Sequence, residues 1–168
     1  AAHPLELDMP SFDPASYGDS CAAYYDQLYP SVARGQVEAL EELSRGGLAL
    51  ELGLATGRVA LPLAARGVEV HGVEASPAML GRFRFLPRAS SVRAVAGDFS
   101  RLPYRGPFRL VFSLVGTLGL LPSRRLQASC LREVARVLEP GGTFVSEAHD
   151  LAPADQASTV EHAILTPK

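Results

Sequence analysis

The sequence predicts a doubly wound α/β fold, in which a mostly parallel sheet carries helices on both faces. Two observations support this prediction. Short apolar runs alternate along most of the chain with segments whose apolar residues recur at helical spacing. The runs are apolar at nearly every position, which is typical of strands covered on both faces. Strands that alternate with helices are joined by right-handed crossovers, and they are therefore parallel.

The composition is that of a one-domain globular protein. The chain has 168 residues, of which 47% are hydrophobic and 20% charged. Its net charge of −2 argues against nucleic acid or an anionic membrane as a partner held mainly by electrostatics. Cys21 and Cys130 have no metal-ligand spacing, and neither a signal peptide nor a membrane span is visible. We therefore expect a cytoplasmic protein without a metal site.

The first elements lead into the first strand. In residues 1–17, prolines and scattered acids leave the apolar residues without helical or strand spacing. We therefore expect residues 1–30 to form an arm and the start of a lid. Residues 31–168 would then form the main domain. Ser31–Arg45 is predicted to be a helix that Gly46 and Gly47 end, and Leu48–Leu54 is predicted to be the first strand.

The later elements follow the same alternation. Helices are predicted at Val59–Arg66, after Pro77 at its first turn, and after Ser123 as N-cap, up to the turn at 139–142. The remaining strands are predicted at Glu69–Glu74, Val92–Ala96, Leu110–Val115 and Thr143–Ala148.

Residues with distinctive chemistry follow the ends of these strands. Gly53, Ala55 and Gly57 follow the first strand, Glu74 ends the second, and Asp98 follows the third. In a doubly wound sheet, ligands bind outside the carboxyl ends of the strands. We therefore expect these turns to meet at one ligand site.

The first turn differs from a dinucleotide fingerprint. That fingerprint is G-x-G-x-x-G, whereas residues 51–57 read ELGLATG. A carboxylate at Glu51 would repel a phosphate and suits a ligand with an amino group or a positive centre. Glu74 is placed to accept hydrogen bonds from both hydroxyls of a ribose. Asp98 is placed to accept a hydrogen bond from the amine of a base, and Phe99 can cover the face of that base. These positions suit a ligand that has a positively charged group, a ribose and a base amine but no phosphate next to the turn. Such a ligand is S-adenosylmethionine rather than NAD.

Five segments resemble class I S-adenosylmethionine-dependent methyltransferases. ELGLATGRVALPLAARGVEVHGVEASPAML, residues 51–80, resembles their first two motifs. VAGDFSRLP (95–103) resembles their acidic adenine motif, and FRLVFSLVGTLGLLP (108–122) their fourth-strand motif. LREVARVLEPGGTFVSEAH (131–149) is similar to the helix, turn and fifth strand that follow. AAYYDQLYP (22–30) resembles the start of the small-molecule branch, where a tyrosine-rich helix covers the cofactor.

The resemblance implies a Rossmann-like fold and a role for each matching residue. Glu51 and the glycine turn would hold the methionine part, Glu74 the ribose, and Asp98 the adenine. The full set of expected cofactor contacts is Tyr24, Tyr25, Glu51, Gly53, Ala55, Gly57, Glu74, Ala75, Met79, Gly97, Asp98, Phe99, Leu114 and Gly116. His149 and Asp150 follow the fifth strand and are the candidates for a general base.

Each of these residues also has a purely structural interpretation. The glycine turn could join strand to helix without a ligand, Glu74 could be a solvated strand end, and Asp98 could cap a turn. The tyrosines could be core residues, and the two candidate bases could belong to a polar loop. The chain also departs from the family. Ala55 replaces the usual middle glycine, and the sequence of the last two strands of the family fold is absent before Lys168.

The resemblance implies methyl transfer to a small-molecule acceptor, a metabolite or natural product, by in-line displacement. The protein would align the nucleophile and exclude water. The alternative is a non-catalytic or truncated S-adenosylmethionine-binding module, whose open sheet edge pairs with a second copy in a homodimer. An NAD-dependent oxidoreductase is disfavoured by Glu51 and the glycine spacing, and a nucleic-acid methyltransferase by the charge balance.

Overall fold

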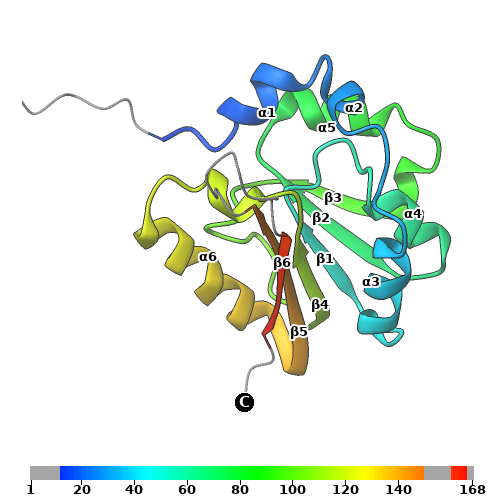
Figure 1. Cartoon of the computed structure of the whole chain (residues 1–168), viewed down its shortest axis with the longest axis vertical. Coiled ribbons are helices and arrows are strands. Elements are labelled where there is room, and N and C mark those ends of the chain that lie inside the picture. The colour runs from blue at the N-terminus through cyan, green and yellow to red at the C-terminus, as the bar shows by residue number, and fades with distance from the viewer. Residues whose placement is uncertain (1–11, 150–159, 166–168) are drawn as a thin grey trace, which may run out of the picture.

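A computed structural model of the chain describes residues 12–149 and 160–165. It contains one six-stranded sheet with the order β3-β2-β1-β4-β5-β6 (Figure 1). Strands β1 to β5 are parallel, and β6 runs antiparallel to β5. The strands are β1 Ala49–Leu52, β2 Val70–Glu74, β3 Val92–Ala96, β4 Phe108–Ser113, β5 Leu138–His149 and β6 Val160–Leu165. The predicted fold class is confirmed.

Helices cover both faces of the sheet (Figure 1). They are α1 Ser16–Cys21, α2 Tyr25–Leu28, α3 Gln36–Ser44, α4 Ala60–Ala65, α5 Pro77–Arg84 and α6 Arg124–Val137, with single turns η1 Ala89–Ser91 and η2 Thr117–Leu120. Side chains from α3, α4 and α5 pack in one apolar cluster, and those from α6 pack in another on the opposite face. No helix among the described residues is long and apolar enough to cross a membrane.

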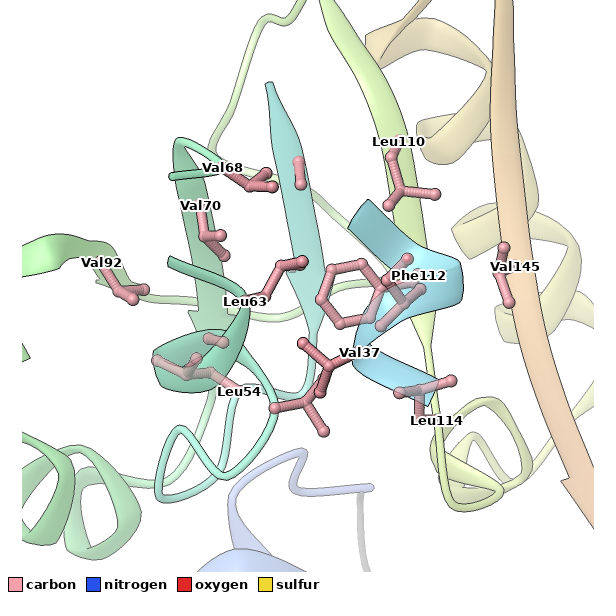
Figure 2. Packing of buried hydrophobic residues seen from close by; sticks show 14 of the residues in the cluster. Val37, Leu54, Leu63, Val68, Val70, Val92, Leu110, Phe112, Leu114 and Val145 are labelled. Atoms are coloured by element: carbon pink, nitrogen blue, oxygen red, sulfur yellow. The ribbon is translucent and has the colours of Figure 1, made fainter. Parts of the chain in front are cut away.

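The central strands β1, β2 and β4 are mostly apolar because both of their faces are buried. Figure 2 shows the cluster on the face of α3, to which β2 contributes Val70, β4 contributes Leu110 and Phe112, and β5 contributes Val145. The intervening residues Leu50, Val111 and Phe144 point to the opposite face and pack with α6. This alternation on a parallel sheet explains the continuous apolar runs of the sequence.

Several boundaries differ from the predicted ones. β4 begins at Phe108 instead of Leu110, and β5 begins at Leu138 instead of Thr143. The helix expected from Ser31 begins at Gln36, because Gly35 has a φ of 80° and lies outside the helical region of backbone space. A short helix, α1, begins at Ser16, inside the stretch 1–17 in which the sequence shows no periodicity. The division into an arm at 1–30 and a domain at 31–168 stays a prediction.

The sheet does not stop at its fifth strand. The expectation that the last two strands are missing is wrong in one respect, because β6 pairs with β5 from Phe144↔Leu165 to His149↔Val160. The outer edge of β5 therefore has a partner, since β6 takes up its free backbone groups. A second copy that added to this sheet would have to pair with one of the two edge strands, β3 or β6, and not with β5.

Candidate functional site

The turn after β1 depends on left-handed backbone at three positions. Gly53 has a φ of 74° and Gly57 a φ of 79°. A Cβ on Gly53 would lie 2.6 Å from Cγ2 of Thr117, and one on Gly57 would lie 2.7 Å from the ring of Phe83. Ala55 also has a positive φ of 50°, which explains why glycine is usual there. The turn is therefore compact and brings backbone amides to the edge of the sheet.

Glu74 joins the turns that follow β1 and β2. Its side chain is buried, and its Oε2 accepts a hydrogen bond from the amide of Ala55 at 2.8 Å. Its Oε1 accepts from the amide of Ser76 at 2.8 Å. Burial raises the pKa of Glu74, and the hydrogen bonds from Ser76, Ala55 and Ala75 oppose that rise. The carboxylate is thus fixed at the carboxyl edge of the sheet.

Glu51 is a buried carboxyl group behind the same turn. Its side chain is 5% exposed, and burial raises its pKa to about 8 against the opposing effect of Arg58. Among the described residues, Oε2 of Glu51 has no hydrogen-bond partner. A buried polar atom without a partner is costly, so this oxygen is suited to a donor that a ligand brings.

A narrow cavity lies between these turns and the helices α1 and α2. Its volume is about 40 Å³. It is lined by seven residues expected to contact the cofactor, Tyr25, Gly53, Ala55, Glu74, Ala75, Met79 and Phe99, and by Pro14, Tyr17, Gly18, Thr117 and Leu120. The turns after β1 and β2 therefore meet at one place, as the fold predicts.

A wider cavity of about 550 Å³ adjoins the narrow one. Tyr17, Tyr25, Thr117 and Leu120 line both. The other residues that line the wider cavity are Tyr29, Val115, Gly116, Leu118, Gly119, Gln127, Ser146, Glu147 and Ala148. A third cavity of about 450 Å³ lies against α3, and Leu114 lines this one instead of the narrow cavity.

Several predicted cofactor contacts, Glu51 among them, do not line the narrow cavity. Tyr24 is 46% exposed, and Gly57 packs on Phe83. Gly97 lies close to Pro103. Asp98 bonds to Ser100, with Oδ1 accepting from the amide at 2.7 Å and Oδ2 from the hydroxyl at 2.7 Å. Asp98 thus caps a turn, one of the two roles open to it from the sequence, and its contact with adenine stays a prediction.

The candidate bases are only partly described. His149 is the last residue of β5, and its side chain is not described. Asp150 lies outside the described residues. Their role in catalysis stays a prediction.

Sequence reasoning missed Tyr17 and Glu147, among other residues that line the cavities. Tyr17 belongs to the stretch without a period. Glu147 lines two cavities at the carboxyl end of β5. A single acid at the end of an otherwise apolar strand was the pattern that identified Glu74, and it could have identified Glu147 as well.

The helices α1 and α2 are held over the narrow cavity by polar contacts. Oδ1 of Asp19 accepts a hydrogen bond from Oγ of Ser76 at 2.5 Å. Asp26 accepts from Oγ1 of Thr56 at 2.6 Å and from Nη2 of Arg82 at 3.0 Å. Apolar contacts accompany these bonds, because Cys21, Ala22, Tyr25, Ala55 and Met79 form one buried cluster. The arm thus closes the cavity in this conformation.

The fold and this site together define a Rossmann-like nucleotide-binding domain with a carboxylate at the end of β2. Residues 49–142 match the family described as "Methyltransferase domain". The chain belongs to the class I S-adenosylmethionine-dependent methyltransferases. The family predicted from the sequence is confirmed, and so is S-adenosylmethionine as its cofactor.

Three relatives illustrate the similarity. The cypemycin N-terminal methyltransferase of Streptomyces sp is 28% identical over 160 residues, which cover 92% of this chain and 65% of the relative. The CcbJ methyltransferase of Streptomyces caelestis is 38% identical with a TM-score of 0.76, over 87% of this chain and 62% of that one. The glycopeptide N-methyltransferase MtfA, complexed with S-adenosylhomocysteine, is 26% identical with a TM-score of 0.58, over 82% and 67%. The chain thus spans less than two thirds of the first two relatives.

Proposed function

We propose that this chain transfers a methyl group from S-adenosylmethionine to a small-molecule acceptor, a metabolite or natural product. The observation that carries the proposal is the pair of adjoining cavities. The narrow one is lined by the Gly53 turn and Glu74, with Glu51 behind the turn, and the wider one has room for an acceptor. Two relatives support the acceptor class, since their names refer to cypemycin and to a glycopeptide.

The residues present fit the cofactor. Oε2 of Glu51 is a buried acceptor without a partner among the described residues, which suits the amino group of the methionine part. Glu74 would accept hydrogen bonds from the ribose hydroxyls, because a carboxylate has about four lone-pair sites, more than the backbone amides of Ala55, Ser76 and Ala75 use. Met79 and Phe99 would pack against the adenine. The turn at Gly53 offers backbone without side chains in the way.

The chain would act mainly by positioning. When bound, S-adenosylmethionine supplies an electrophilic methyl group on a positively charged sulfur. Tyr25 and Thr117 line both cavities, so they would stand beside the point where acceptor and cofactor meet. The arm at α1 and α2 would exclude water from this point. A base contributes only where the acceptor must lose a proton, and His149 and Asp150 are proposed for it on position alone.

The test is calorimetric titration with S-adenosylmethionine, with NAD as the control ligand. We expect saturable binding to the wild-type chain and binding at least about tenfold weaker in Glu74→Gln, since hydrogen bonds to a charged group contribute about 1.5–3 kcal/mol. Glu69→Gln is the matched control, because Glu69 is half-exposed just before β2 and lines none of the three cavities. Equal affinity in wild type and Glu74→Gln, or preference for NAD, would contradict the proposal.

A successful titration leads to the activity assay. The acceptor would be sought by mass spectrometry, as a mass gain of one methyl group in a small-molecule panel together with formation of S-adenosylhomocysteine. Cofactor binding without methylation of any acceptor would favour the alternative of a non-catalytic binding module.

A further inference from the structure

Glu147 is the one charged side chain among the described residues that line the wider cavity. Its Oε2 accepts hydrogen bonds from the amide of Val115 at 3.0 Å and from Nε2 of Gln36 at 3.4 Å. Both bonds use the same oxygen, so within the described part of the chain Oε1 keeps its capacity to accept. The carboxylate is therefore positioned by the protein and still able to bind a ligand.

The loop that holds Glu147 is strained. Val115 has a φ of 55°, which is unusual for a β-branched residue, and Gly116 has a φ of 67°. Two bonds fix the loop on β5: the one from the Val115 amide to Oε2 of Glu147, and one from the Gly116 amide to the carbonyl of Glu147 at 3.2 Å. Strained backbone persists where its surroundings impose it, and it gathers at functional sites. The carboxylate of Glu147 and this loop thus form one rigid side of the wider cavity.

The tyrosines of the cavity add faces that attract cations. Tyr25 and Tyr29 lie with ring centroids 4.9 Å apart, and both line the cavity together with Tyr17. Burial raises the pKa of Tyr25 to about 12 and that of Tyr17 above its usual value, so these phenols are neutral near pH 7. Aromatic faces attract ammonium groups by electrostatics. Arg58 lies 5.8 Å from the ring centroid of Tyr29 but does not line this cavity.

We propose that the acceptor is an amine and that Glu147 is the residue that selects it. The proposal rests on the proposed methyl transfer and names its substrate class. A single carboxylate beside aromatic rings attracts an ammonium group and repels carboxylates and phosphates. In the reaction, the ammonium first gives a proton to water. The nitrogen lone pair then forms the bond to the methyl carbon, while the carbon–sulfur bond breaks and its electron pair goes to sulfur.

The test measures binding of three probes of one shape: 3-phenylpropylamine, 3-phenylpropanol and 3-phenylpropanoic acid. Each is titrated by ligand-observed NMR with and without S-adenosylhomocysteine. We expect the wild-type chain to bind the amine about tenfold more tightly than the alcohol and to bind the acid least. In Glu147→Gln the preference for the amine over the alcohol should disappear, while affinity for the alcohol stays the same.

Glu133→Gln is the matched control. Glu133 also accepts a backbone hydrogen bond, from the amide of Leu102 at 2.9 Å, but it lies on α6 away from the cavity. Both substitutions remove one negative charge and keep an acceptor for the amide, so thermal unfolding should show that both variants fold. Only Glu147→Gln should lose the preference.

Three results would overturn the proposal. They are a wild-type chain that does not prefer the amine at millimolar concentrations, a preference that survives in Glu147→Gln, and an equal loss in both variants. Failure of the proposed methyl transfer gives a different result: S-adenosylhomocysteine does not bind in a titration without probes. The titrations without S-adenosylhomocysteine then still decide whether Glu147 selects amines.

Discussion

Replacing Gly53 with alanine tests whether the turn after β1 and the loop after β4 are packed so closely that neither can move away from the other. Gly53 belongs to the turn after β1, and Thr117 belongs to the loop after β4. A Cβ at position 53 would lie 2.6 Å from Cγ2 of Thr117, closer than packed atoms allow. The next atoms of Thr117 lie at 3.5 and 3.7 Å, which is ordinary contact. One methyl group of Thr117 is therefore responsible for the clash.

Two costs are expected in Gly53→Ala. Left-handed backbone costs alanine about 1–2 kcal/mol, and the lower entropy of its unfolded chain offsets about 0.4–1 kcal/mol of this. The overlap with Thr117 adds about 1–3 kcal/mol, the usual cost of overpacking. The free energy of unfolding should therefore fall by about 2–4 kcal/mol.

Two further variants separate these costs. Thr117→Ser removes Cγ2 and keeps the hydroxyl that donates to the carbonyl of Leu114 at 2.7 Å. In that background Gly53→Ala should cost only about 1 kcal/mol, the conformational part. Gly35→Ala is the control for this part, because Gly35 has a φ of 80° and no atom within 4 Å of an added Cβ.

Urea denaturation measures these changes, with the slope m checked for constancy. The coupling between positions 53 and 117 should be about 1–3 kcal/mol, within the range of residues in direct contact. If Gly53→Ala costs the same in both backgrounds, the two loops move apart freely and the reasoning fails.

Two other predictions concern the buried acid and the arm. Burial raises the pKa of Glu51 to about 8 from a usual 4.5, so the folded state binds a proton that the unfolded state has released. The free energy of unfolding should therefore fall as pH rises from about 5 to 8. Urea denaturation should show this slope, and Glu51→Gln should abolish it. Binding of S-adenosylmethionine at pH 7 should release close to one proton from Glu51, detectable by calorimetry in buffers of different ionisation enthalpy. Asp26→Ala removes the contacts to Thr56 and Arg82 and should speed deuterium uptake by residues 16–28, whereas uptake equal to wild type would show that these contacts do not hold the arm.

Most of the fold could be predicted because it depends on local pattern. Strands β1, β2 and β4 are mostly apolar runs with turn residues beside them, and their burial on both faces requires that pattern. Strand β6 was missed because its sequence mixes Glu161 and His162 with apolar residues. An edge strand has no need to be apolar throughout, so periodicity gives little information there.

The site was predictable where it follows from topology. Gly53 and Glu74 lie at the carboxyl ends of adjacent parallel strands, and the sheet brings such ends together. Tyr17 and Gly18 could not be found, because α1 is placed by tertiary contacts such as the approach of Gly18 to Ser76. Asp98 could not be assigned either, since the same carboxylate suits both a turn cap and a ligand contact.

The closed arm has a kinetic consequence. The narrow cavity holds about 40 Å³, the space of one or two water molecules, whereas small-molecule sites measure about 300–1,000 Å³. With α1 and α2 in this position, the cofactor would need both helices to move away from Ser76 and Thr56 before it reaches Glu74. Capture then includes a unimolecular step, and its observed rate in stopped-flow mixing should level off at high cofactor concentration. The plateau would report how often the arm opens, a property of the protein alone and independent of the ligand.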